Sequence, residues 1–191
     1  MIRFSRLFFV GSCLFFALSS CGRSYTEEDL SESGLSVDSL SLAKEREEKL
    51  LMETNKIMIA KEQERISAYA QRRGWKMEFV DGVFVQILTE SNTGKGFVEG
   101  DVLEVEYECG LLNGERVYSS KKDGVIVLKV GKGGDCPLGL QMAIERMTDG
   151  TNARVIVPYN MAYGLAGDGN KVPKAASLVY ELSVKKQNIR K

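Results

Sequence analysis

The spacing of apolar residues changes at Gly82, and this change constrains the fold more than any other feature of the chain. After Gly82, apolar and polar residues alternate, as in the segments GVFVQILTE and DVLEVEYEC. In the second segment one face is glutamate, and the other is formed by Leu103, Val105, Tyr107 and Cys109. Alternation of this kind is typical of strands with one buried face. The chain after Gly82 is therefore predicted to be mostly β-sheet.

The order of the elements in this part of the chain predicts an α+β fold. Asn113-Gly114 lies between two strand-like segments and is a strong signal for a hairpin. The segments GVIVLKVG, ARVIVP and SLVYELSVKK are further strands, whereas LGLQMAIERM has the spacing of one short helix. Strands on both sides of a short helix predict an antiparallel sheet of five to six strands wrapped around that helix.

A long helix is predicted before the sheet. Residues 41–73 contain no Pro or Gly and are dominated by strong helix formers. Ser41 can cap the helix and Gly74 can end it, which gives a charged helix over residues 41–74. One interpretation is a solvated spacer whose second half packs on the domain, and the alternative is a homodimer formed through residues 41–73. The spacer is favoured because no apolar heptad repeat holds for three heptads.

The N-terminus has the pattern of an export signal over residues 1–20. Arg3 and Arg6 precede the apolar run LFFVGSCLFFAL, which is too short for a permanent membrane span. The tetrapeptide LSSC, which ends at Cys21, resembles the lipobox of bacterial lipoproteins. That resemblance implies cleavage before Cys21 and lipidation of this residue, and the alternative is a soluble secreted protein cut nearby. Residues 21–40 are rich in Ser, Gly and acidic residues and are predicted to form a flexible tether.

The charge balance and the absence of histidine exclude several classes of function. Lys+Arg and Asp+Glu both number 26, so no net field recruits nucleic acid. Loss of Arg3 and Arg6 with the signal would leave 24 basic against 26 acidic residues, a net charge of −2. The chain has no histidine, which removes the usual general base, metal ligand and partner of a nucleophile. No cofactor and no metal are expected.

Two cysteines remain for the folded domain after removal of the signal and lipidation of Cys21. They are Cys109 and Cys136. In an oxidising compartment they could form a disulfide, but two buried free thiols are the preferred interpretation because Cys109 continues an apolar face.

Several segments occur in an order that resembles the FKBP-type peptidyl-prolyl cis-trans isomerase domain. They are GDVLEVEY, LNGERVYSS, LKVGKGG, the helix that ends in ERMTDG, and VIVPYNMAYGLAGDGNKVPKAASLVYELSV. The resemblance covers residues 80–187, and its most specific stretch is AYG followed by VPKAASLVY. It implies an FKBP-like fold and prolyl isomerase (rotamase) activity. The order of tether, charged helix and domain also resembles exported FKBP lipoproteins of Bacteroidota-type bacteria.

The same resemblance implies a set of site residues. Tyr163 matches the tyrosine whose hydroxyl bonds a carbonyl of the bound peptide, so it is the predicted catalytic residue. The implied substrate-binding residues are Tyr107, Val117, Tyr118, Ile126, Cys136, Pro137, Leu140, Val172 and Tyr180. For Tyr107 and Tyr180, a place in the core is an equally good interpretation. Tyr163 lies in a Gly-flanked loop, where packing explains less.

Three of these positions depart from the family pattern. Tyr118 stands where the family has Asp, which removes a polar partner for the ligand. Leu140 stands where a Trp floor is expected, and Pro137 stands where a backbone N–H is offered, although proline has none. These departures predict reduced catalysis.

Two functions follow from the resemblance and its departures. The favoured one is a prolyl isomerase that assists folding of exported proteins at the cell envelope, anchored by lipid to an outer membrane and facing the periplasm. Its partners would be proline-containing polypeptides. The alternative is a catalytically weak or inactive FKBP-like module that binds polypeptide at the membrane.

Overall fold

The computed structural model describes residues 37–90 and 95–187. The predicted signal, Cys21 and the tether up to residue 36 lie outside the described residues. The chain divides into two compact units, Met1–Leu50 and Leu51–Lys191. Within residues 37–90 and 95–187, no helix combines the length and the apolar character that a membrane span requires.

The long helix α2 extends over Val37–Arg72 and begins four residues before the predicted start at Ser41. The nearest preceding helix breaker is Gly34, so nothing in residues 37–40 interrupts the helix. The boundary between tether and helix at residue 40 is therefore wrong. The predicted end is confirmed: Gly74 adopts a φ of +66°, and the N–H of Trp75 donates to the carbonyl of Ala70 at 3.0 Å.

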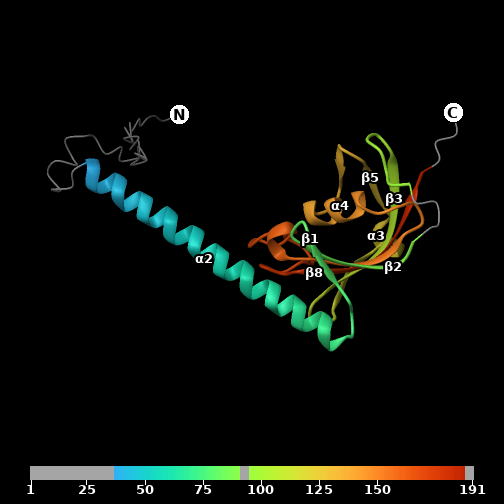
Figure 1. Cartoon of the computed structure of the whole chain (residues 1–191), viewed down its shortest axis with the longest axis horizontal. Helices are drawn as coiled ribbons and strands as arrows, with labels where there is room; N and C mark the ends of the chain where they lie inside the picture. The colour runs from blue at the N-terminus through green and yellow to red at the C-terminus, as the bar shows by residue number, and fades with distance from the viewer. Residues whose placement is uncertain (1–36, 91–94, 188–191) are drawn as a thin grey trace, which may run out of the picture. The chain divides into compact units, whose positions relative to one another are not determined.

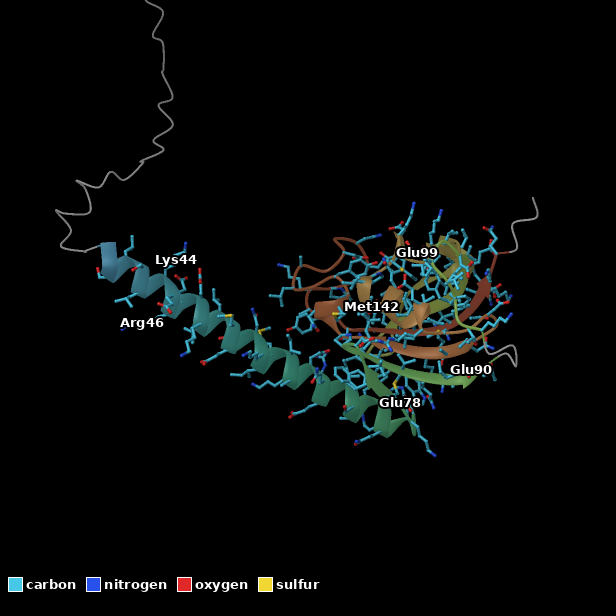
Figure 2. All side chains as sticks on the ribbon, turned by 45° about the horizontal axis from the view of Figure 1, so that its top comes forward. Lys44, Arg46, Glu78, Glu90, Glu99 and Met142 are labelled. Atoms are coloured by element: carbon cyan, nitrogen blue, oxygen red, sulfur yellow. The ribbon has the colours of Figure 1, made fainter. Side chains whose placement is uncertain are left out.

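The side chains of α2 that belong to the first unit are exposed to solvent. Residues 40–50 are all exposed, and Figure 2 shows the side chains of Lys44 and Arg46 extending from the helix. Exposure of mostly charged residues agrees with the composition of this segment.

An antiparallel sheet forms the second unit and curls around a short helix (Figure 1). The strand order is β1-β2-β7-β8-β3-β5-β6, with β4 paired to β3. The strands are β1 (Glu78–Val80), β2 (Val83–Thr89), β3 (Val102–Leu111), β4 (Arg116–Ser119), β5 (Ile126–Lys129), β6 (Gly133–Gly134), β7 (Asn152–Val157) and β8 (Leu178–Lys186). The expected five to six strands become eight because β1 and β6, of three and two residues, join the ends of the sheet.

The helix inside the curl is α4 (Leu138–Glu145), and the α+β prediction is confirmed. Leu140 and Ile144 of α4 are fully buried against the inward face of β3 and β8. Close packing explains Gly139, since a Cβ atom there would lie 2.8 Å from the Cβ of Met161. Two single turns complete the domain, α3 (Ser120–Asp123) and the 3-10 helix η1 (Tyr159–Met161).

The opposite face of the sheet packs on the second half of α2. Ile66 and Tyr69 of this helix form a cluster with three strand residues, Phe84, Ile156 and Val179. Strands β7 and β8 are thus buried on both faces, which accounts for the uninterrupted apolar run VIV in β7. The last turns of α2, from Glu62 to Ala70, therefore pack with the sheet, as the spacer interpretation expects for the second half of the helix.

Candidate functional site

A cavity of about 250 Å³ opens beside Tyr163, between β3, β4, the segment before β5 and the segment before α4. Seven of the predicted site residues line it: Tyr107, Tyr118, Ile126, Cys136, Pro137, Tyr163 and Tyr180. Its other lining residues are Asp123, Gly124, Val125, Val127 and Asp135. The structure thus brings together residues that are far apart in the sequence. Their contact with a substrate stays a prediction.

Val117, Leu140 and Val172 do not line this cavity. All three are buried in the core cluster around α4. The burial of Val117 is explained by the alternation of side chains along β4, because Val117 points to the opposite face from its neighbour Tyr118. Because Tyr107, Tyr118, Ile126 and Cys136 pack against the same cluster, these three residues support the cavity wall from behind. Substitution of Val117, Leu140 or Val172 would therefore change ligand binding only through the residues that line the cavity.

Tyr163 is held at the cavity rim by the turn that follows η1. The N–H of Gly164 donates to the carbonyl of Tyr159 at 2.7 Å, and Gly164 adopts a φ of +64° that favours glycine. The side chain of Tyr163 remains 37% exposed. Partial burial, reinforced by the negative charge of Asp168, raises the pKa of Tyr163 to about 12. Its hydroxyl therefore stays protonated at neutral pH and is available as a hydrogen-bond donor.

Asp168 organises the loop beside the cavity and was not among the predicted site residues. Its carboxylate accepts a hydrogen bond from the hydroxyl of Tyr118 and from the N–H groups of Asn170 and Val172, the latter two at 2.8 Å. Burial alone would raise the pKa of Asp168, but these hydrogen bonds hold it below its usual value. The sequence GDGN, with an Asp that can bond the backbone two residues on, was an available signal for this turn.

The expectation that Tyr118 removes a polar partner from the site is therefore wrong in part. The hydroxyl of Tyr118 supplies a polar group of its own, which is engaged with Asp168. This hydrogen bond raises the pKa of Tyr118 and keeps the phenol neutral. Lys171 also contacts this tyrosine: its Nζ lies 4.4 Å from the centre of the Tyr118 ring and 3.2 Å from Oδ1 of Asp123.

The inner wall of the cavity holds two aromatic rings and a thiol. The ring centres of Tyr107 and Tyr180 are 6.1 Å apart in a tilted arrangement. Cys109 and Cys136 are both free thiols, as preferred, but only Cys109 is fully buried, because Cys136 is half-buried and lines the cavity. Burial raises the pKa of Cys109 to about 12 and that of Cys136 to about 11, so neither forms a thiolate at neutral pH.

A buried hydrogen-bond chain connects α2 with the turn that carries Tyr163. The hydroxyl of Ser177 donates to Oε1 of Glu62 at 2.5 Å and accepts from the N–H of Tyr159 at 3.0 Å. Glu62 is 7% exposed and also pairs with Arg65, with Nη2 at 3.2 Å. No local pattern indicated this role, because Glu62 belongs to a helix rich in charged residues.

Backbone groups directly before α4 give a ligand little to bind. Pro137 has no N–H, and the carbonyl of Cys136 accepts from Nε2 of Gln141 at 2.8 Å. Across the described ranges, no three His, Cys, Asp or Glu side chains are grouped so that they could hold a metal ion. The site can bind an apolar group among its aromatic rings and donate a hydrogen bond from Tyr163.

The chain is similar to known proteins over the domain that holds this cavity. Residues 94–185 match the family of FKBP-type peptidyl-prolyl cis-trans isomerases. The human peptidyl-prolyl cis-trans isomerase FKBP9 is 33% identical over 86 residues, which are 45% of this chain and 15% of that protein. FK506-binding protein 2 of Dictyostelium discoideum is 30% identical over 86 residues, 44% of this chain and 64% of that protein.

A bacterial relative and a solved structure extend the comparison. The probable FKBP-type peptidyl-prolyl cis-trans isomerase FkpA of Neisseria meningitidis is 30% identical over 104 residues, 52% of this chain and 36% of that protein. The N-terminal domain of FKBP42 from Arabidopsis thaliana superimposes with a TM-score of 0.53 at 25% identity, over 59% of this chain and 93% of that structure. The chain thus covers less than two thirds of the length of each of the three relatives in sequence.

Proposed function

Since residues 94–185 form an FKBP-type domain, we propose that this protein is a peptidyl-prolyl cis-trans isomerase that binds proline-containing segments in the cavity beside Tyr163. One observation carries the proposal: the cavity is open, is lined by aromatic rings, and has a protonated hydroxyl at its rim. A proline ring would lie among Tyr107, Ile126 and Tyr180, and Tyr163 would donate to a carbonyl of the bound peptide.

The reaction requires no proton transfer and no covalent intermediate. An X–Pro bond rotates slowly because amide resonance raises a barrier of about 18–20 kcal/mol. The twisted transition state has lost this resonance and much of its charge separation, so apolar surroundings that a bound peptide shields from water would stabilise it relative to the planar ground state. A hydrogen bond from Tyr163 to a neighbouring carbonyl would hold the peptide in place during the rotation. The absence of histidine from the chain is compatible with such chemistry.

A second function is supported by the polar groups of the same cavity. Pro137 provides no N–H, and the carboxylate of Asp168 already accepts three hydrogen bonds. Besides Tyr163, a ligand would meet the carboxylates of Asp123 and Asp135, which accept hydrogen bonds but donate none when ionised. A cavity of this kind could bind polypeptide without accelerating rotation. The second candidate is thus an inactive or weakly active FKBP-like module that binds polypeptide.

A protease-coupled assay separates the two functions. Purified protein is added to tetrapeptides that differ in the residue before proline, and the cis-to-trans rate is followed through cleavage of the trans form. We expect a rate that rises linearly with protein concentration for at least one peptide. A rate equal to the uncatalysed one for every peptide would overturn the enzyme proposal. Binding of the same peptides without acceleration would then support the module.

The cellular setting is a further part of the proposal. The export pattern and the lipobox-like tetrapeptide before Cys21 support a lipid-anchored protein of the bacterial cell envelope that assists folding of exported proteins. Several acyl chains on one residue would give a stable anchor, and we place it at the outer membrane, facing the periplasm. The order of tether, helix and domain supports a lipoprotein of the Bacteroidota type.

Metabolic labelling with an alkyne fatty acid tests the anchor. Cys21→Ser should abolish incorporation of the label, whereas Cys13→Ser should leave it unchanged, because Cys13 would be removed with the signal. Labelling that persists in Cys21→Ser would contradict the anchor, while the isomerase proposal would be unaffected.

A further inference from the structure

A series of hydrogen bonds connects α2 with the backbone turn that carries Tyr163. The N–H of Gly164 donates to the carbonyl of Tyr159 at 2.7 Å. The N–H of Tyr159 donates to Oγ of Ser177 at 3.0 Å, and the hydroxyl of Ser177 donates to Oε1 of Glu62 at 2.5 Å. We propose that Glu62 is a positioning residue for the isomerase reaction, which fixes the turn of Tyr163 through Ser177.

The carboxylate of Glu62 determines how the hydroxyl of Ser177 is oriented. A serine hydroxyl has one proton and two lone pairs, so it donates to one partner and accepts from others. Because Glu62 takes the proton, a lone pair of Oγ is left for the N–H of Tyr159. Ser177 is 1% exposed and Glu62 is 7% exposed, so water has little access to either group. Removal of the Glu62 acceptor would leave a buried hydroxyl that turns to another acceptor, which weakens its bond to Tyr159.

Packing alone does not explain a carboxylate at position 62. Ile66 and Tyr69 already attach the last turns of α2 to the outer face of the sheet. An apolar side chain at position 62 would extend that contact, whereas a buried carboxylate loses its hydration and adds little net stability even when it has partners. Its partners here are Arg65 and Ser177. The acceptor at position 62 therefore contributes a defined geometry more than it contributes stability.

The position of the turn matters because Tyr163 must reach a carbonyl of the bound peptide, so the inference rests on the proposed function. The side chain of Tyr163 is partly exposed, and its placement therefore depends strongly on the backbone that carries it. Reaction rates depend steeply on such placement, and a shift of about 1 Å can lower a rate roughly 100-fold. The last turns of α2 then belong to the isomerase unit, because they hold the residue that donates to the substrate.

Two substitutions of Glu62 test this role in the full chain. Glu62→Gln keeps an oxygen that accepts from Ser177, whereas Glu62→Met removes this oxygen and keeps a similar shape. In the protease-coupled assay, Glu62→Met should lower kcat/KM about 3- to 10-fold, and Glu62→Gln should keep it within about 2-fold. Unchanged activity of Glu62→Met, or an equal loss in both variants, would overturn the proposal.

A double substitution shows whether Glu62 acts through Tyr163. Residues that act as a unit have non-additive effects. Glu62→Met should therefore cause no further loss of kcat/KM when it is added to Tyr163→Phe. A further loss of the same size as in the unsubstituted protein would show that Glu62 acts elsewhere, and it would contradict the positioning role.

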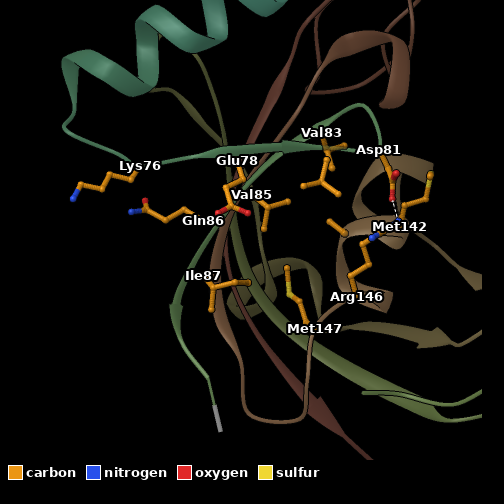
Figure 3. A pocket seen from close by; sticks show the side chains of 12 residues that line it. Lys76, Glu78, Asp81, Val83, Val85, Gln86, Ile87, Met142, Arg146 and Met147 are labelled. Carbon is orange, nitrogen blue, oxygen red and sulfur yellow. Dashed lines mark ion pairs between the residues drawn. The ribbon is translucent and has the colours of Figure 1, made fainter. Parts of the chain in front are cut away.

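Val85→Ala is the control for a general loss of packing. Val85 lines a second cavity of about 350 Å³ between the β1–β2 hairpin and α4, which Figure 3 shows. This second cavity shares no lining residue with the cavity at Tyr163. Val85→Ala should lower the melting temperature but leave kcat/KM unchanged well below it. If activity instead falls in proportion to thermal stability in both Val85→Ala and Glu62→Met, the effect of Glu62 is only structural and the proposal fails.

Amide hydrogen exchange tests the same connection independently of isomerase activity. In the ¹⁵N-labelled full chain, Glu62→Met should raise the exchange rates of the Tyr159 and Gly164 amides about 3- to 10-fold, because both N–H groups donate within the connected turn. Glu62→Gln should leave these rates unchanged. If no proline peptide is isomerised but the rates rise in Glu62→Met, the proposed function fails while the control of the turn by Glu62 stands. Unchanged rates in Glu62→Met would overturn the inference whatever the activity.

Discussion

At the scale of single residues, Tyr163 combines partial exposure with a pKa of about 12. Exposure makes its hydroxyl accessible to a ligand, and the raised pKa keeps the proton on the hydroxyl throughout the physiological range. By contrast, the hydroxyl of Tyr118 is engaged with Asp168. Of these two phenols at the cavity, Tyr163 is therefore the one whose hydroxyl is not engaged with Asp168 and is exposed to a ligand.

Tyr163→Phe should lower kcat/KM for proline peptides about 3- to 10-fold, which corresponds to the loss of one neutral hydrogen bond. The protease-coupled assay measures this loss directly. Tyr69→Phe is a matched control, since Tyr69 packs in the other core cluster and does not line the cavity. Unchanged activity of Tyr163→Phe would show that the catalytic assignment is wrong.

Cys109 predicts how stability depends on alkaline pH. Burial raises the pKa of its thiol from 9.0 to about 12, so the folded protein keeps a proton that the unfolded chain releases above pH 9. Because the folded state binds more protons in this window, the free energy of unfolding should fall as pH rises from 9 to 12. The contribution of one thiol has a limiting slope of about 1.4 kcal/mol per pH unit, and it is fully present below pH 9.

Urea denaturation between pH 7 and 11 measures this effect. Cys109→Ala should flatten the decline above pH 9 relative to the unsubstituted protein, even if the variant is less stable at every pH. Parallel profiles for the two proteins would show that Cys109 does not retain its proton in the folded state.

At the scale of elements, the strands and their hairpin were predictable because they depend on local pattern. The alternation in β3 and the Asn113-Gly114 turn each involve residues close in sequence, and both predictions are confirmed. The packing of α2 on the outer face of the sheet was harder to predict. Val179 and Ile156 contact α2, but an apolar residue on the outer face of a strand does not identify the element that covers it.

The polar contacts of the site were unpredictable for a similar reason. Tyr118 and Asp168 are 50 residues apart, and Ser177 and Glu62 are 115 apart. No local spacing relates such residues, so only the folded backbone shows that they meet. The family resemblance supplied seven residues that line the cavity, but it did not indicate the contacts of Asp168 and Glu62.

Two isoleucines of α2 test the packing of this helix on the sheet. Ile66 is fully buried, so Ile66→Ala should lower the free energy of unfolding by about 2–5 kcal/mol. Ile57 lies in the same helix and is 56% exposed, so Ile57→Ala should change it by less than about 0.5 kcal/mol. Urea denaturation of both variants provides the comparison. Equal effects would contradict the packing of the last turns of α2, around Ile66 and Tyr69, on the sheet.

At the scale of the whole molecule, α4 separates two cavities of different character. Pro137 and Cys136, directly before α4, line the cavity at Tyr163, whereas Met142 and Ala143 of α4 line the second cavity. One short helix packed inside the curl of the sheet therefore leaves hollows at both of its borders.

The oligomeric state depends on the surface of α2. Ala43, Leu50 and Ile57 recur every seven residues, but the alternate positions of the same repeat are occupied by Glu47, Thr54 and Lys61. A two-stranded coiled coil needs apolar residues at both positions, and Glu47 facing its own copy in a parallel pair would be repelled. The helix should therefore act as a spacer, and the protein should be a monomer. Sedimentation velocity at micromolar concentration measures this directly, and Ile57→Glu should leave the sedimentation coefficient unchanged. A dimer that Ile57→Glu dissociates would instead establish residues 41–73 as a dimerisation surface.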